Sequence, residues 1–118
     1  MQIGIDYDFT SLNPYIDAER ANRYAAANIK KTETTVAQLA AMDRQPIRDY
    51  PVKVKFTWFR KDERTDPDNL AFACKFILDG FVKGKLLEGD QWKHISGICH
   101  EFKKSSNNYV VVEIIERK

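Results

Sequence analysis

The stretch from Pro67 to about Lys83 is predicted to be a helix that is apolar on nearly every side. Within it, the run from Leu70 to Leu78 contains a single charged residue, Lys75. Gly84 follows at the position that glycine favours just after a helix. A helix with so little polar surface has to be covered by other parts of the chain, so we expect it to lie against a β-sheet.

Strand patterns occur on both sides of this helix. Residues Val52 to Phe59 alternate apolar side chains with lysines and a threonine, which predicts a strand with one basic face. Residues Gln2 to Phe9 predict a short first strand, and Ile95 to Phe102 and Tyr109 to Ile115 predict two more. The turn-prone residues 105–108 separate the last two strands, so we expect these strands to form a hairpin.

A second helical region precedes the basic strand. Residues Tyr15 to Met42 are rich in Ala, Lys, Gln and Glu and contain no Pro or Gly, which predicts one long helix or two helices broken near Lys31 to Glu33. Residues Gln45 to Pro51, with two prolines, form a connector. This order of elements predicts one α+β domain spanning residues 1–118, with a mixed sheet of about four strands and helices packed on one face.

Composition limits the classes of protein to consider. An apolar fraction of 43% and a charged fraction of 31% are typical of a globular domain with one core. The net charge of +2 does not by itself indicate a nucleic-acid partner. The first residues do not resemble a signal peptide, and no apolar run is long enough to cross a bilayer. We therefore expect a cytoplasmic protein with no membrane partner.

The two cysteines do not suggest a disulfide or a zinc site. Cys74 and Cys99 are isolated, and the cytosol keeps such thiols reduced. His94 and His100 lie nearby in sequence, but no pair of these residues has the spacing of zinc ligands. The preferred interpretation is that the cysteines are small buried residues and the histidines are surface or strand residues.

Two acidic residues stand at the start of the apolar helix, and they can have a structural or a functional role. Asp66 is a favoured helix N-cap, Pro67 suits the first helical position and Asp68 complements the helix dipole, so a structural role alone explains this motif. The lone Lys75 adds a second signal, because its ammonium must reach water or an anion. In one continuous helix Asp68, Lys75 and Asp79 would share a stripe, and a simple Lys75–Asp79 ion pair is the alternative.

Metal chemistry is the functional interpretation of these acids. Asp66 and Asp68, with a third carboxylate from Asp90 in the loop around Gly89, make a set of hard oxygen donors that suits Mg²⁺ or Mn²⁺. Magnesium can orient a water and neutralise charge on a phosphodiester. A calcium EF-hand is excluded, because the loop glycine is missing and Ile77 stands where the closing glutamate belongs.

The segment from Asp66 to Trp92 resembles the signature of RusA-type endodeoxyribonucleases, which resolve Holliday junctions. The resemblance comprises an Asp-x-Asp-Asn, a lysine four residues before an aspartate, and an aspartate before the next strand; here these are Asp66, Asp68, Asn69, Lys75, Asp79 and Asp90. The N-terminal S-L-N-P-Y, Arg20 and the Lys30–Lys31 pair are similar to the phage-associated branch of this family. The resemblance therefore covers nearly the whole chain.

The resemblance implies a homodimer that binds four-way or branched DNA during recombination and repair, in a bacterial host cell and encoded by a phage or prophage. It implies that Asp66, Asp68 and Asp90 coordinate Mg²⁺, with Mn²⁺ able to substitute, and that paired symmetric nicks result. Lys75 would act near the scissile phosphate. Three residues have supporting roles: Asn69 would hold the turn or a ligand, Asp79 could be structural, and Glu88 is a reserve ligand or base.

Basic and aromatic residues outside this motif give weaker indications. A set of basic residues leads along the second predicted strand toward the carboxylates and could track phosphates: Lys53, Lys55, Arg60, Lys61 and Arg64. The alternative is the solvated face of an edge strand. Trp58 and Trp92 are both expected to pack in the protein, although Trp92, near Asp90, could stack on a base.

Three functions remain open from the sequence. The first is a junction-resolving nuclease. The second is a non-catalytic module that binds branched or single-stranded DNA, in which the aspartates are helix caps. The third is a metal-dependent nuclease that acts on flaps or other branched DNA.

Overall fold

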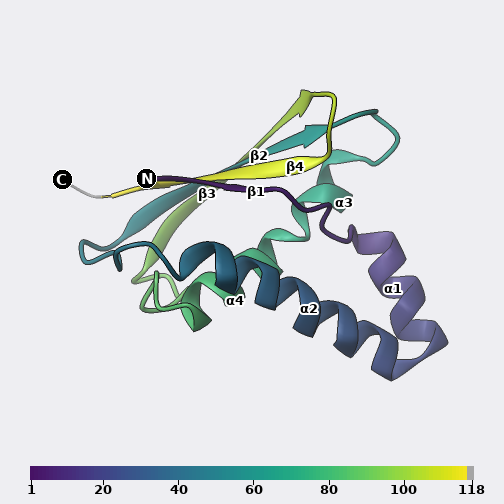
Figure 1. The fold of residues 1–118 in the computed structure, drawn as a ribbon, viewed down its shortest axis with the longest axis horizontal. Coiled ribbons are helices and arrows are strands. Elements are labelled where there is room, and N and C mark those ends of the chain that lie inside the picture. Colours follow the sequence, from purple (N-terminus) through teal and green to yellow (C-terminus); the bar gives the residue numbers. More distant parts are fainter. Residues whose placement is uncertain (117–118) are drawn as a thin grey trace.

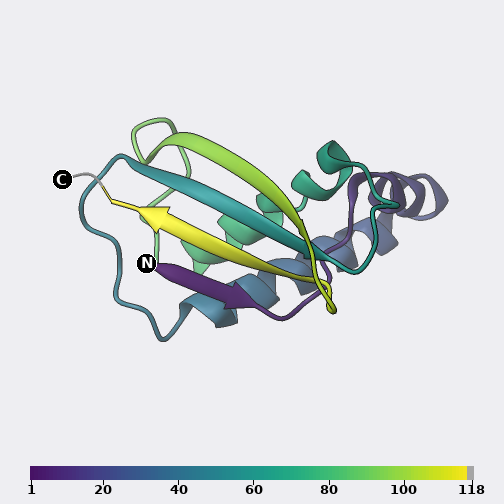
Figure 2. The same ribbon diagram turned by 90° about the horizontal axis from the view of Figure 1, so that it is seen from above.

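Four strands form one mixed sheet in the computed structural model, which describes residues 1–116 (Figures 1 and 2). The strands are β1 (Gln2–Ile5), β2 (Val52–Arg60), β3 (Ile95–Lys104) and β4 (Tyr109–Ile115). Their order across the sheet is β1-β4-β2-β3. Strands β2 and β3 are parallel, and β4 runs antiparallel to both β1 and β2. The α+β class and the mixed four-stranded sheet are thus confirmed.

The helices lie on one face of this sheet (Figures 1 and 2). Helix α1 (Leu12–Ala21) and helix α2 (Arg23–Ala41) follow β1, and α3 (Pro67–Ala71) and α4 (Cys74–Lys83) connect β2 to β3. The break between α1 and α2 is at Asn22, so the break predicted near Lys31 to Glu33 is wrong. Asn22 has an extended backbone and its side chain accepts a hydrogen bond from Tyr24 N, which caps α2.

The apolar segment forms two helices where the sequence predicted one. Helix α3 ends at Ala71 and α4 begins at Cys74, with the turn at Phe72 and Ala73. No proline or glycine marks this break. The Phe72 ring packs against Tyr15 of α1, with centroids 5.3 Å apart, so the turn is associated with a contact between distant segments that the local sequence does not reveal. Gly84 follows α4 as predicted.

The predicted hairpin between the last two strands is wrong. Strand β4 does not pair with β3, because β2 lies between them. The turn at residues 105–108 returns the chain across β2, and β4 enters the sheet between β1 and β2. The reason is burial: Val110, Val112 and Ile114 are almost fully buried and need a central position, whereas most of β3 is exposed and suits an edge.

Close packing of two helices fixes how α2 lies on α4. A Cβ atom built at Gly80 of α4 would be 2.5 Å from Ala37 Cβ and 2.5 Å from Thr34 O, both in α2. Real Cβ atoms do not approach other atoms so closely, so only glycine allows this crossing. Phe76, Ile77 and other buried side chains of α4 then fill the space between α2 and the sheet.

No helix of the described residues covers the opposite face of the sheet (Figure 1). Lys53, Lys55 and Thr57 of β2 point to this face, because their neighbours along the strand are buried against the helices. Strand β2 is central, so the alternative that these lysines lie on an edge strand is wrong. Among residues 1–116, no helix has the length and apolar character needed to span a membrane.

Candidate functional site

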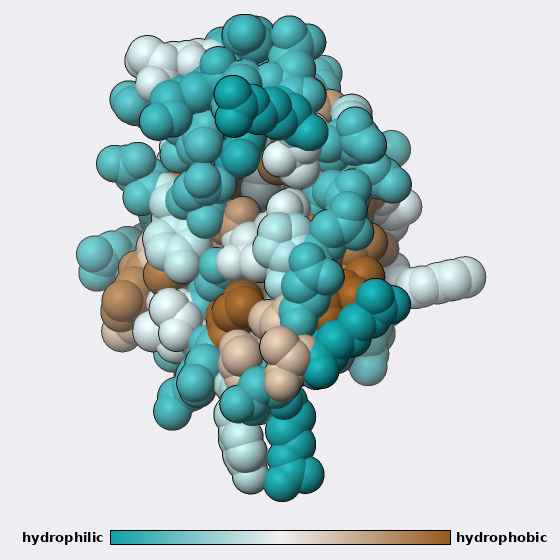
Figure 3. Space-filling view, turned by 90° about the vertical axis from the view of Figure 1, so that its right-hand side faces the viewer, coloured by the Kyte–Doolittle hydropathy of each residue, from teal (hydrophilic) through white to brown (hydrophobic). Residues whose placement is uncertain are grey.

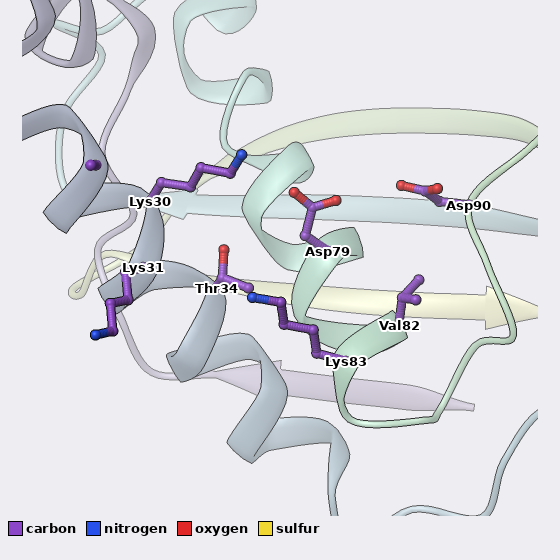
Figure 4. Close-up of a pocket in the computed structure, with 8 residues that line it drawn as sticks. Lys30, Lys31, Thr34, Asp79, Val82, Lys83 and Asp90 are labelled. Atoms are coloured by element: carbon purple, nitrogen blue, oxygen red, sulfur yellow. The ribbon is translucent and has the colours of Figure 1, made fainter. Parts of the chain in front are cut away.

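An open cavity of about 440 Å³ lies between α2, α4 and the loop that leads to β3 (Figure 4). Helix α2 contributes Lys30, Lys31 and Thr34, α4 contributes Asp79, Val82 and Lys83, the loop contributes Asp90, and Ala27 completes the lining. In Figure 4 the Lys30 side chain extends from α2 toward Asp79, and the Asp90 carboxylate is turned toward the same space. The cavity therefore combines two carboxylates with lysines from two helices.

The position of Asp90 is set by an anchored loop. Leu86 and Leu87 are almost fully buried, and Glu88 N donates a hydrogen bond to Tyr50 Oη at 2.9 Å. Gly89 lies against the His94 ring so closely that a Cβ at residue 89 would be 2.5 Å from His94 Cε1. Asp90 is thus held by packed residues on both sides of it in the chain.

The lysines of α2 are positioned by a buried carboxylate one turn away. Glu33 is 3% exposed and accepts hydrogen bonds from Thr10 N at 2.8 Å, Thr10 Oγ1 at 2.6 Å and Tyr7 Oη at 3.2 Å. Burial, together with the Glu33 charge, raises the pKa of Tyr7 above its ordinary value. These bonds tie α2 to the segment after β1 and fix Lys30 at the cavity.

The cavity lysines are not engaged in ion pairs within the described part of the chain. No carboxylate among residues 1–116 pairs with Lys30, Lys31 or Lys83. Asp79 is paired with Lys75 of its own helix at 3.7 Å. At neutral pH the three lysines and two aspartates give the cavity lining a formal charge of +1. Such a site can receive an anion such as a phosphate.

The lysine predicted to act near a phosphate lies outside this lining. The Lys75 side chain is 62% exposed, and its contact with Asp79 is the i, i+4 ion pair that the sequence offered as the alternative. Because α3 and α4 are separate helices, the predicted stripe joining Asp68 to Lys75 and Asp79 does not exist. Glu88 is exposed and is also outside the cavity lining.

Asp66 and Asp68 lie at the start of α3. Asp66 is the N-cap as predicted, but its side chain makes no capping hydrogen bond. Asp68 Oδ1 accepts a hydrogen bond from Asn69 N at 3.0 Å, and Asn69 Oδ1 is buried without a partner in the described structure. Capping therefore does not account for the Asp66 carboxylate.

The three predicted metal ligands are not assembled into one group. Within residues 1–116, no three His, Cys, Asp or Glu side chains lie close enough together to hold a metal ion. Asp90 lines the cavity, whereas Asp66 and Asp68 do not. Asp79, predicted as a supporting residue, shares the cavity with Asp90. The three-aspartate set stays a prediction.

The face of the protein at the α1 and α3 end is largely hydrophilic, with small separated hydrophobic areas (Figure 3).

The basic residues predicted to track DNA do not form one surface with the cavity. Lys53 and Lys55 point to the open face of the sheet, and Lys55 pairs with Glu101 at 3.3 Å. Arg60 is paired with Asp8 at 2.6 Å, while Lys61 and Arg64 are exposed in the following loop. The lysines near the carboxylates come instead from α2 and α4, which sequence reasoning did not bring together.

Of the predictions for the tryptophans and cysteines, some are confirmed and others are wrong. Trp58 is 3% exposed, as predicted, but Trp92 is 96% exposed, so its predicted packing is wrong. Cys74 is half-buried, and burial raises the pKa of its thiol. Cys99 is exposed on edge strand β3, which contradicts the prediction of a buried residue. Both thiols are free.

Comparisons with known proteins add no family assignment. No protein-family model matches this chain, and no curated protein is significantly similar to it. The functional argument therefore depends on the cavity, its charges and the sequence motif.

Proposed function

We propose that this chain is a Mg²⁺-dependent endonuclease that cleaves branched DNA, with four-way junctions as its expected substrate. The observation that carries the proposal is the cavity in which Asp79 and Asp90 share a surface with Lys30 and Lys83. Carboxylates and ammonium groups around one open space suit phosphodiester hydrolysis, because carboxylates can hold a metal cation and ammonium groups can hold the phosphate. The RusA-like motif from Asp66 to Asp90 supports the same chemistry.

The donor chemistry of the site fits magnesium. Every candidate ligand is a carboxylate oxygen, and Mg²⁺ typically keeps several waters while binding one or two carboxylates and a substrate phosphate. Asp90 and Asp79 would hold it from the cavity, and Asp66 and Asp68 are the further predicted ligands. When bound, the ion supplies charge neutralisation at the phosphate and lowers the pKa of a coordinated water.

The lysines have a separate task in this proposal. Lys30 and Lys83 have no carboxylate partner in the described chain, so their ammonium groups are available for phosphate oxygens. They would hold the DNA backbone in register with the carboxylates and stabilise the charge that develops on the phosphate. Lys75, predicted to have this role, is engaged with Asp79 and would act mainly through it.

A substrate with two-fold symmetry is matched by an enzyme with two-fold symmetry. We infer a homodimer, because a C2 dimer would present two identical cavities to a junction that can itself adopt two-fold symmetry. Cleavage at both cavities would give the paired symmetric nicks expected of a junction resolvase.

The experiment compares a four-way junction, a flap and a linear duplex of matched sequence, with Mg²⁺, with Mn²⁺ and with EDTA. Paired nicks on the junction alone, absent in EDTA and lost in Asp68→Asn, would support the proposal in full. Cleavage mainly of the flap would change the substrate and keep the chemistry. Tight junction binding with no cleavage in either metal would contradict the proposal and favour a DNA-binding module.

A further inference from the structure

Trp92 has the most exposed large hydrophobic side chain of the described residues. It is 96% exposed, and the next most exposed large hydrophobic side chains of the described chain, Tyr24 and Leu39, are 63% and 62% exposed. Tryptophan usually contributes by burying a large apolar area, so full exposure forgoes that contribution. A ligand that stacks on the exposed ring would bury this apolar area.

The exposure is built into the backbone. Gln91 O accepts hydrogen bonds from His94 N at 2.8 Å and from Ile95 N at 2.9 Å, which closes a tight turn with Trp92 on its outer side. His94 and Ile95 are buried, and Leu86 and Leu87 anchor the loop before the turn. The turn therefore holds the Trp92 backbone at the surface of the protein.

Trp92 follows the cavity residue Asp90 by two positions and lines a separate open hollow of about 410 Å³ with Ile95 and Ser96. Asp90 lines the cavity, and the Cα atoms of residues 90 and 92 can be at most about 7.6 Å apart, because consecutive Cα atoms are separated by about 3.8 Å. This distance is comparable with the size of one nucleotide. The hollow at Trp92 and the cavity are therefore neighbours along the chain, and a single strand that reaches from one to the other would contact both the ring and the lysines.

We propose that the hollow at Trp92 and the neighbouring cavity form a subsite for an unpaired stretch of a nucleic-acid strand, with one base stacked on Trp92 and a phosphate of the same strand held by Lys30 and Lys83. The inference rests on the proposed nucleic-acid substrate, and it names the part of that substrate that the site selects. A paired base is already stacked inside its duplex, so only an unpaired base can cover the ring. Aromatic stacking with a basic groove is how single strands are commonly bound.

The test measures binding of an oligothymidylate in EDTA, where metal-dependent cleavage is blocked. Trp92 fluorescence should change on binding, whereas Trp58 is 3% exposed and donates a hydrogen bond to His100, so its emission should stay constant. Trp92→Phe should lose the signal but keep affinity within about three-fold, since phenylalanine also stacks, and Trp92→Ala should weaken binding about ten-fold. A labelled oligonucleotide gives the affinity by anisotropy.

The lysines are tested by salt dependence. Lys30→Ala and Lys83→Ala should each lower the slope of log affinity against log salt by about 0.7, the value for one lost phosphate contact on a single strand. Lys103→Ala, at an exposed position near the end of β3 and outside the cavity lining, is the matched control and should leave the slope unchanged. An equal effect of Lys103→Ala would overturn the subsite.

Two outcomes separate this inference from the proposed function. A Trp92 response to the oligonucleotide, with no cleavage of any DNA in Mg²⁺, would support the subsite while contradicting the nuclease. Junction cleavage with unchanged Trp92 emission and full affinity in Trp92→Ala would contradict the subsite alone. A shift of Trp92 emission with protein concentration in the absence of DNA would also overturn it, because a second copy would then cover the ring.

Discussion

Gly80 of α4 and Ala37 of α2 approach each other so closely that a Cβ at residue 80 would lie 2.5 Å from Ala37 Cβ. This contact brings together the two helices that carry Lys30 and Asp79, the residues that face each other across the cavity. The geometry of the candidate site therefore depends on a glycine that has no chemical role in it.

Gly80→Ala should destabilise the protein and weaken the site together. Alanine favours a helix over glycine by about 1 kcal/mol, but the overpacked contact with Ala37 and Thr34 should cost about 1–3 kcal/mol. Gly4→Ala is the control, because nothing lies within 4 Å of a Cβ there. Urea denaturation of both variants checks this expectation. A Gly80→Ala protein as stable as the parent would show that α2 and α4 are not packed as described.

Glu33→Ala should lower the free energy of unfolding by about 2–3 kcal/mol. The substitution leaves Thr10 N, Thr10 Oγ1 and Tyr7 Oη without their shared acceptor, and hydrogen bonds to a charged group contribute about 1.5–3 kcal/mol. Glu19→Ala on the exposed surface of α1 should change stability by less than about 0.5 kcal/mol. Denaturant unfolding followed by circular dichroism compares the two. Equal effects would show that the hydrogen bonds from Thr10 and Tyr7 to Glu33 do not hold α2 to the segment after β1.

His100 should make stability depend on pH below neutrality. Burial lowers the pKa of its imidazole below the ordinary value of 6.5, and Trp58 Nε1 donates to His100 Nδ1 at 3.0 Å, which requires the unprotonated nitrogen. Between 6.5 and the lower folded pKa, the unfolded chain binds more protons than the folded one. The free energy of unfolding should therefore fall as pH falls through this window and should not vary through this group above it.

His100→Phe is the variant for this measurement. Phenylalanine keeps a ring next to Phe56 and Trp58 but has no proton to bind, so the decline between pH 6.5 and lower values should become shallower. His94 is present in both proteins and does not affect the difference. An unchanged pH slope in the variant would show that His100 does not contribute.

Much of the fold follows from local patterns that the sequence displays. The alternation in Val52 to Phe59 predicts β2 and its basic face, and Pro67 and Gly84 mark the outer limits of the helical segment. Asn22 also carries a visible signal, because asparagine is a favoured N-cap, although it stands within an alanine-rich run.

The remaining features depend on contacts between distant segments. The position of β4 between β1 and β2 is explained by the burial of its own side chains and the exposure of most of β3, and alternation alone does not encode this difference. The turn at Phe72 is associated with a contact to Tyr15 of α1. The cavity is built from α2, α4 and a loop, so no motif spacing in one segment could bring Lys30 and Lys83 to Asp90. Apolar character alone wrongly predicted that Trp92 packs.

Substituting single aspartates tests whether the metal ion is held by the motif residues, by the cavity residues or by both. If both describe the site, Asp68→Asn and Asp90→Asn should each reduce Mg²⁺-dependent cleavage by more than about a hundred-fold, because removing even an outer partner of a metal ligand costs 10–100-fold. Asp79→Asn should have a comparable effect only if Asp79 holds the ion from the cavity. Asp43→Asn, an exposed aspartate outside the cavity lining, is the control and should retain activity.

The most direct measurement is Mg²⁺-dependent cleavage of a synthetic four-way junction by the parent protein and by Asp90→Asn, with junction binding measured for both in Ca²⁺. The account predicts paired symmetric nicks by the parent, and a variant that still binds the junction but does not cut it. A parent protein that binds the junction and leaves it intact in both Mg²⁺ and Mn²⁺, or an Asp90→Asn variant that cuts at the parent rate, would contradict it.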